Sequence, residues 1–256
     1  MEFKEKLLAS HLAFEGGIDL SDPVHRTRLE SLKTFEQIGF PSRKDEAWKY
    51  TSLNAMIRND YALFPKTETT IEIKKVKKYF LYEIDTYKVV FIDGAYSPFL
   101  SDTTHDGLDV CLMSAALSKA KYRKFIDSYF NKIANIKDSL TALNTSYTKE
   151  GAYIYVPKSV VAEKPIELIH FSTGKEKPLW LQPRNLIVVD KNAQVQILER
   201  HQSLKPHEVV TNSVTEIFTH QDAFLDYYKI QNVRERWIDI EAVEEWARNG
   251  GNSRVA

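Results

Sequence analysis

Short stretches of apolar residues, several of them alternating with polar ones, fill the chain between residues 151 and 232. This pattern is typical of β-strands. We predict six strands here, at 153–156, 165–170, 185–189, 193–197, 213–219 and 223–230. No helical pattern separates these strands, so a sandwich, a barrel and a solenoid of strands all remain open. An internal repeat would favour the solenoid, but the sequence shows one only loosely.

Residues 1–60 are expected to form an N-terminal helical region. Asp22 followed by Pro23 is typical of a helix start, and Gly39 suits the end of the same helix. The predicted apolar stripe of that helix consists of Leu29, Leu32, Phe35 and Ile38.

Residues 61–150 are expected to hold a linker, short strands and helices. The linker includes the lysine-rich run 73–78, which we interpret as a solvated face. Strands are predicted at 79–83 and 87–92, and helices from 113 to 144. Residues 233–256 are expected to form an atypical helical tail, with Ile240, Val243 and Ala247 on one face.

Charge and cysteine content narrow the classes of function. Lys plus Arg number 35 and Asp plus Glu number 35, a balance that argues against a nucleic-acid or membrane-surface partner. No apolar run is long enough to span a bilayer, and acidic residues interrupt the N-terminus, so a cytoplasmic location is expected. The single cysteine, Cys111, excludes an intrachain disulfide and cannot supply the usual four thiolates of an iron–sulfur cluster.

Few residues suggest catalysis. The chain has no phosphate loop, dinucleotide fingerprint or serine nucleophile elbow. Glu199, His201 and His207 form the densest acid–base group of the predicted β region, which supports one hypothesis, a metal-dependent β-fold enzyme. His170 is interpreted as a residue of the core or its rim.

Several segments, taken in order, resemble the SufB/SufD family of iron–sulfur cluster assembly proteins, and within it the SufD branch. They are RKDEAWKYT (43–51), VFIDGAYSP (90–98), ALNT (142–145), GAYIYVPK (151–158), EKPI (163–166), PRNLIV (183–188), VTEI (214–217) and LDYYKIQ (225–231). The resemblance implies the fold class α+β, in which the N-terminal helical region precedes an incomplete right-handed parallel β-helix and a short C-terminal helix.

The resemblance also implies a function without catalysis. The chain is expected to be a scaffold that acts with SufB-like and SufC-like subunits, and a homodimer is a further possibility. No cofactor is expected on this chain alone, since an iron–sulfur cluster would form at an interface with SufB. The match stops near Gln231, and the family's SufC-binding C-terminal helices have no counterpart here, so no catalytic or metal residue is carried over and the SufC contact is in doubt. An inactive fragment that ends in an unrelated tail is the remaining alternative.

Overall fold

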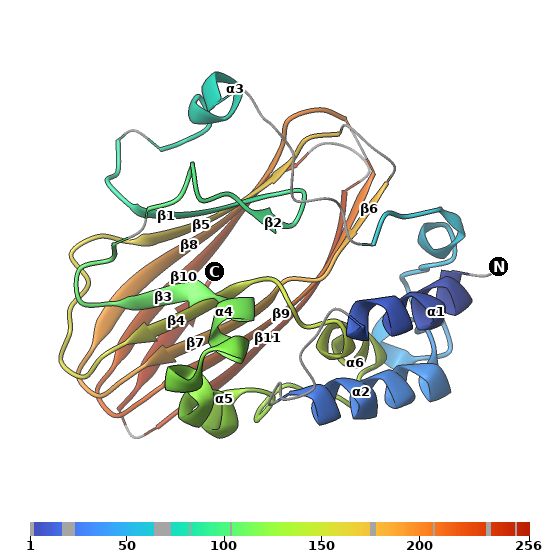
Figure 1. The fold of residues 1–256 in the computed structure, drawn as a ribbon, viewed down its shortest axis with the longest axis horizontal. Coiled ribbons are helices and arrows are strands. Elements are labelled where there is room, and N and C mark those ends of the chain that lie inside the picture. Colours follow the sequence, from blue (N-terminus) through green and yellow to red (C-terminus); the bar gives the residue numbers. More distant parts are fainter. Residues whose placement is uncertain are drawn as a thin grey trace.

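Two sheets of mostly parallel strands lie face to face in the second half of the chain (Figure 1). The computed structural model describes residues 3–16, 24–63, 73–81, 83–102, 104–174, 178–206, 208–233, 237–248 and 250–256. The first sheet has the strand order β12-β10-β8-β5-β1-β2, and the second has the order β11-β9-β7-β4-β3, with β6 paired to β9. The strands are β1 (Tyr87–Ile92), β2 (Ala95–Tyr96), β3 (Asp109–Leu112), β4 (Ala152–Val156), β5 (Ile166–Ser172), β6 (Leu179–Leu181), β7 (Arg184–Val189), β8 (Gln194–Ser203), β9 (Val209–Thr219), β10 (Phe224–Asn232), β11 (Trp237–Ala247) and β12 (Asn252–Val255).

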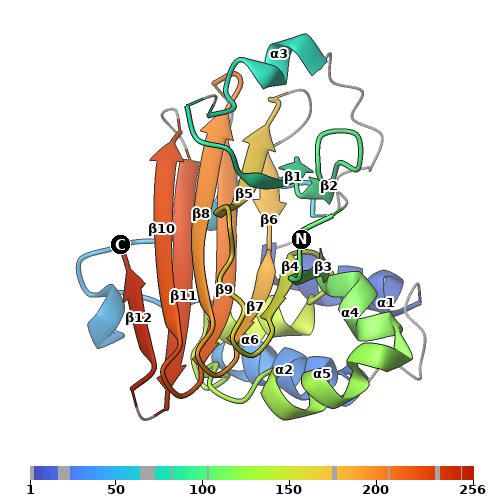
Figure 2. The same cartoon turned by 90° about the vertical axis from the view of Figure 1, so that its left-hand side faces the viewer.

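The chain winds between the two sheets, one strand in each per rung. The rungs are β4 with β5, β7 with β8, β9 with β10, and β11 with β12, and each strand pairs in parallel with its equivalent in the next rung. Figure 2 shows β10, β11 and β12 as the outermost of these strands. This winding is a parallel β-solenoid, which confirms the predicted β-helix and excludes the sandwich and the barrel.

The register reveals the repeat that the sequence shows only loosely. Arg184 lies opposite Val214, 30 residues later, and Phe224 lies opposite Asn252, 28 residues later. One tight turn of each of the last three rungs holds a residue in the left-handed region, namely Asn192 (φ 57), Asp222 (φ 57) and Gly250 (φ 78). A Cβ on Gly250 would lie 2.5 Å from Asp222 Oδ1, so these corners stack closely. The backbone conformation and the spacing of these corners repeat from rung to rung, but the residue type does not. The repeat is therefore difficult to recognise in the sequence.

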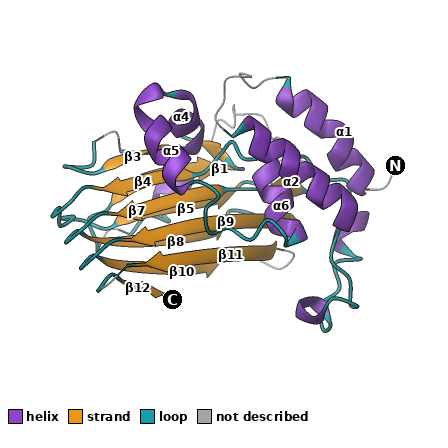
Figure 3. Ribbon diagram, turned by 90° about the horizontal axis from the view of Figure 1, so that it is seen from below, coloured by secondary structure: helices purple, strands orange, loops and turns teal. Residues whose placement is uncertain are grey.

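Helices cover the second sheet and one end of the solenoid (Figure 3). They are α1 (Phe3–Glu15), α2 (His25–Ile38), α3 (Ile73–Lys77), α4 (Met113–Ser118), α5 (Arg123–Tyr129) and α6 (Ser139–Ser146), with short 3-10 turns at Glu46–Trp48, Met56–Arg58 and Ala120–Tyr122. Side chains of α1, α2 and α6 pack in one cluster with Trp180 of β6 and Val210 of β9, whereas those of α4 and α5 pack on Tyr153, Leu186 and Phe218. No helix within the described part of the chain is long and apolar enough to cross a membrane.

The predicted N-terminal helix exists, but its buried face differs from the predicted stripe. Gly39 ends α2 with φ 73, and its N–H donates to the carbonyl of Phe35. Phe35 is buried as expected, yet Ile38 is 54% exposed, and Arg28 is buried instead. Arg28 turns inward because its guanidinium donates to the carbonyl of Thr148. The predicted helix start at residues 22–23 lies outside the described residues.

One of the two strands predicted in the middle region is absent from the described residues. The described residues between 79 and 83 form turns and bends, and only β1 of the two predicted strands is present. The lysine-rich run forms the short helix α3, which buries Val76 and leaves Lys74 and Lys75 exposed. The predicted helical stretch 113–144 is divided among α4, α5 and α6.

The predicted C-terminal helix is wrong. The described residues from Trp237 onward form β11 and β12, and β11 pairs with β9 over its whole length, from Trp237 opposite Val209 to Ala247 opposite Thr219. The apolar spacing of Ile240 and Val243 also fits a helix, so the pattern is ambiguous by itself. Pairing with β9 resolves the ambiguity. Without β11, the edge of β9 would have a row of unpaired backbone N–H and C=O groups, and a neighbouring strand satisfies them.

Candidate functional site

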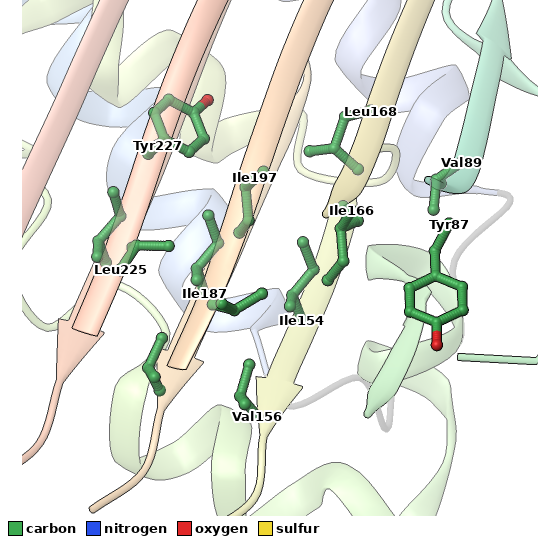
Figure 4. Close-up of a cluster of buried hydrophobic side chains, with 14 of the residues drawn as sticks. Tyr87, Val89, Ile154, Val156, Ile166, Leu168, Ile187, Ile197, Leu225 and Tyr227 are labelled. Atoms are coloured by element: carbon green, nitrogen blue, oxygen red, sulfur yellow. The ribbon is translucent and has the colours of Figure 1, made fainter. Parts of the chain in front are cut away.

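The space between the two sheets divides into an apolar half and a polar half. Figure 4 shows the apolar half, in which side chains from both sheets interdigitate. It contains Ile154, Val156, Ile166, Leu168, Ile187, Val189, Val195, Ile197, Ile217, Leu225 and Tyr227. The polar half contains the buried residues His170, Asn185, Glu199, His201, Thr211, Ser213 and Thr215 and the half-buried Lys229 and Asp239, and the exposed Glu241 pairs with Lys229.

Single strands contribute to both halves. Side chains two residues apart point to the same face of a strand, so β8 places Ile197 in the apolar half and Glu199 and His201 in the polar half. Asn185, at the start of β7, donates to Glu199 at 3.4 Å and to the Thr215 hydroxyl at 3.1 Å. The polar residues of both sheets therefore meet at the same end of the solenoid.

His170, Glu199 and His201 form the most concentrated group of metal-type ligands among the described residues. His170 of β5 is the register partner of His201 of β8, and their rings stack with centroids 4.8 Å apart and planes 15° apart. Phe91 of β1 stacks on the other face of His170, at 4.8 Å and 7°. Each of the three residues offers one ligand atom, and these atoms lie within 4.8 Å of one another.

Glu199 is held by several donors. His201 Nε2 lies 2.7 Å from Glu199 Oε1, the Tyr227 hydroxyl donates to Glu199, and Lys229 Nζ lies 3.9 Å away. Burial alone would raise the pKa of Glu199, but the hydrogen bond from His201 and the nearby positive charge outweigh it and hold that pKa below its usual range. Glu199 is therefore a buried carboxylate in its ionised form.

Burial and the neighbouring charges fix the protonation of the surrounding groups. Burial, with a contribution from His201, lowers the pKa of His170 to about 3, so its imidazole is neutral at neutral pH. Burial and Glu199 raise the pKa of Tyr227, which keeps its proton. Burial lowers the pKa of Lys229, but the carboxylates of Glu199, Asp239 and Glu241 raise it further, and Lys229 stays charged.

A cavity of about 290 Å³ reaches the two histidines. His170, His201, Thr211, Trp180, Tyr147 and Lys149 are among the residues that line it. Within the part of the chain that the structure describes, His170 Nε2, His201 Nδ1, Thr211 Oγ1 and Trp180 Nε1 are buried without a hydrogen-bond partner. Such atoms usually have a protein, water or ligand partner, so their concentration around one cavity indicates a binding site.

The structure supports part of the sequence hypothesis about this group. Glu199 and His201 are in contact, as their proximity in the sequence suggests, while His207 lies outside the described residues. His170, interpreted from the sequence as a core residue, is the third member. His170 lies 31 residues before His201, which is one rung of the solenoid. This spacing predicts that the two residues are neighbours only if the length of a rung is already known.

Two family models together cover nearly the whole chain. The SufBD protein N-terminal region matches residues 18–168, and the SufBD core domain of SUF-system FeS cluster assembly matches residues 170–255. The second match contradicts the expectation that the resemblance ends near Gln231, because the last rung belongs to the core domain. This match also argues against an unrelated tail.

Curated relatives agree with the family models. The chain is 25% identical over 222 residues to an iron-sulfur cluster assembly SufBD family protein of Synechocystis, covering 84% of this chain and 48% of the relative. It is 23% identical to SufD of Bacillus subtilis (80% and 48% covered) and 24% identical to SufD of Escherichia coli (86% and 48% covered). The chain thus spans about half the length of these relatives. With both family models matched in order on a helical region and a parallel solenoid, the chain belongs to the SufBD family of iron–sulfur cluster assembly proteins.

Proposed function

We propose that this chain is a scaffold subunit in iron–sulfur cluster assembly and acts together with SufB-like and SufC-like subunits. The observation that carries the proposal is the ordered match of both family models across residues 18–168 and 170–255. Relatives that carry the name SufD support the SufD type of subunit.

The chemistry of the chain fits a scaffold that depends on partners. Its one cysteine, Cys111, is only partly buried, and burial raises the pKa of its thiol above the usual value, which disfavours the reactive thiolate. Most iron–sulfur clusters use four cysteine thiolates. We therefore expect a SufB-like partner to contribute most ligands of a nascent cluster, which is cargo of the assembly.

Co-purification tests the proposal. The affinity-tagged chain is co-expressed with the SufB-like and SufC-like subunits encoded in the same genome, and the eluted complex is analysed by size-exclusion chromatography and mass spectrometry. We expect the SufB-like subunit to be retained at a fixed ratio and to recruit the SufC-like ATPase.

The controls are the tagged chain expressed alone and each partner passed over the same resin. Failure of the folded chain to retain either partner contradicts the proposal and favours the inactive-fragment alternative. Retention of the SufC-like subunit without the SufB-like one contradicts the expectation that the SufB-like subunit binds this chain and recruits the SufC-like subunit.

A further inference from the structure

We propose that the polar half of the solenoid binds a divalent first-row transition-metal ion through His170, Glu199 and His201. This inference goes beyond the assembly function, because metal binding by this chain requires neither a SufB-like nor a SufC-like subunit. The two proposals can therefore fail independently.

The donor set selects the class of metal. Two imidazoles and one carboxylate suit ions such as Fe²⁺, Co²⁺ and Zn²⁺, whereas Mg²⁺ and Ca²⁺ prefer oxygen ligands alone. The side chains of Glu199 and His201 are 0% and 1% exposed, and His170 is 7% exposed. Bonds from such atoms to zinc are about 2.0–2.2 Å long, so ligand atoms that now lie within 4.8 Å of one another must move closer when the ion binds.

The contact between His201 and Glu199 places two ligands side by side. His201 Nε2 lies 2.7 Å from Glu199 Oε1, and an ion that replaces the proton between them takes both atoms as ligands. His201 Nδ1 and His170 Nε2 are both buried with no partner among the described residues. The ring of His170 is stacked between the rings of Phe91 and His201. This stacking restricts the ring of His170 before a metal binds, which reduces the entropy lost on binding.

The local charge favours a cation. Lys229 Nζ lies 2.7 Å from Asp239, 2.9 Å from Glu241 and 3.9 Å from Glu199, so three carboxylate residues share one ammonium group. Carboxylate residues therefore outnumber ammonium groups around this cluster, and the side chain of Glu199 is 0% exposed. Uncompensated charge is costly away from water, and a bound divalent ion would reduce the imbalance.

The cavity supplies an entry route. It contacts both histidines directly, and the exposed Lys149 is another of its lining residues, so the cavity extends from the histidines to the surface. The alternative is that the stacked imidazoles contribute only to the packing of the solenoid interior. That alternative does not explain why His170 Nε2 and His201 Nδ1, two buried nitrogens of residues that line the cavity, lack partners among the described residues. It also predicts that the chain binds no metal.

Metal titration of the full chain tests the inference. The purified protein is stripped with a chelator and titrated anaerobically with Co²⁺ and with Fe²⁺, following Co²⁺ ligand-field absorption, calorimetric heat and tryptophan fluorescence. Trp237 serves as a local reporter because its ring centroid lies 5.6 Å from that of His201. We expect one ion per chain, with quenching that saturates at the same stoichiometry.

Two variants and one control locate the ion. His170→Phe keeps an aromatic ring in the stack and removes the ligand nitrogen, and Glu199→Gln keeps the shape of the side chain and removes its charge. We expect each variant to bind at least roughly 10–100-fold more weakly, the loss typical of disturbing a metal site. His220→Gln is the matched control, since His220 pairs with Tyr129 outside the cluster, and it should bind like the wild type.

Circular dichroism confirms that each variant compared is folded. If one variant misfolds, the other decides the location. Wild-type protein that takes up no stoichiometric Co²⁺ or Fe²⁺ overturns the inference. It is equally overturned if either folded variant binds both ions as tightly as the wild type.

Discussion

The two halves of the solenoid interior use the same strands for opposite purposes. In the apolar half, Ile187 and Ile197 are fully buried and packed on all sides by other hydrophobic residues. In the polar half, His170 and His201 line a cavity and keep ring nitrogens without partners among the described residues. The comparison indicates that a strand such as β8 contributes to close hydrophobic packing at one end and to a polar cavity at the other.

The connections between strands follow the same division. The turns 190–193 and 220–223 adjoin the apolar half, and each joins two strands through four residues. The longer connection from β5 to β7, which includes β6, adjoins the polar half. Trp180, Leu181 and Gln182 of this connection line the cavity.

Removing the buried ammonium of the polar half should have the largest effect on stability. Lys229→Met leaves Asp239, Glu241 and Glu199 facing one another without a cation. We expect the free energy of unfolding, from urea denaturation, to fall by about 3–5 kcal/mol, the cost of breaking a buried ion pair from one side. Lys191→Met, on an exposed turn residue, is the control. A loss below about 1 kcal/mol would mean that the charges of this half are screened by solvent.

A cavity made in the apolar half should cost nearly as much. Ile187→Ala removes methyl groups from a fully buried position, and we expect a loss of about 2–5 kcal/mol in the same measurement, against about 0.5–1.5 kcal/mol for Ile187→Val. Equal losses for the two substitutions would show that the apolar half is not closely packed.

The boundary between the halves can be tested at Tyr227. Its ring belongs to the apolar half and its hydroxyl donates to Glu199. Tyr227→Phe keeps the ring and removes a hydrogen bond to a charged group, so unfolding should become easier by about 1.5–3 kcal/mol. An unchanged urea midpoint would imply that another donor replaces the hydroxyl.

A smaller effect is expected at the tight turns. Asp222 has φ 57, a conformation that costs most residues about 1–2 kcal/mol. Asp222→Ala should therefore lower the melting temperature, whereas Asp222→Asn should leave it nearly unchanged. The idea that the corner conformation matters is wrong if alanine and asparagine behave alike.

The smallest effect should come from a polar residue beside the cavity. Thr211→Val removes a hydroxyl that has no partner in the described structure and lines the cavity. We expect a change within about 0.5 kcal/mol in unfolding free energy. A loss as large as that of Ile187→Ala would contradict the division, because it would show that the polar half is packed as tightly as the apolar half.

The strands from 151 to 232 could be predicted because each carries its pattern locally. Each of the six predicted strands extends beyond its predicted bounds at one end, and only β6 was missed there, since three residues are too few to show a period. The candidate site was predicted in part. Glu199 and His201 are two residues apart on one strand and are visible as a pair, whereas His170, Tyr227 and Lys229 join them through pairing between rungs.

The sequence by itself determined where most chain segments from 151 to 232 are extended, where the N-terminal region is helical, and that one cysteine cannot supply four thiolates. These properties depend on the period of apolar side chains and on residue counts. Only the tertiary structure decided that 237–247 is a strand and that His170 stacks on His201. Both depend on backbone hydrogen bonds to a neighbouring rung about 30 residues away, and such a partner leaves no mark on the local pattern of either segment.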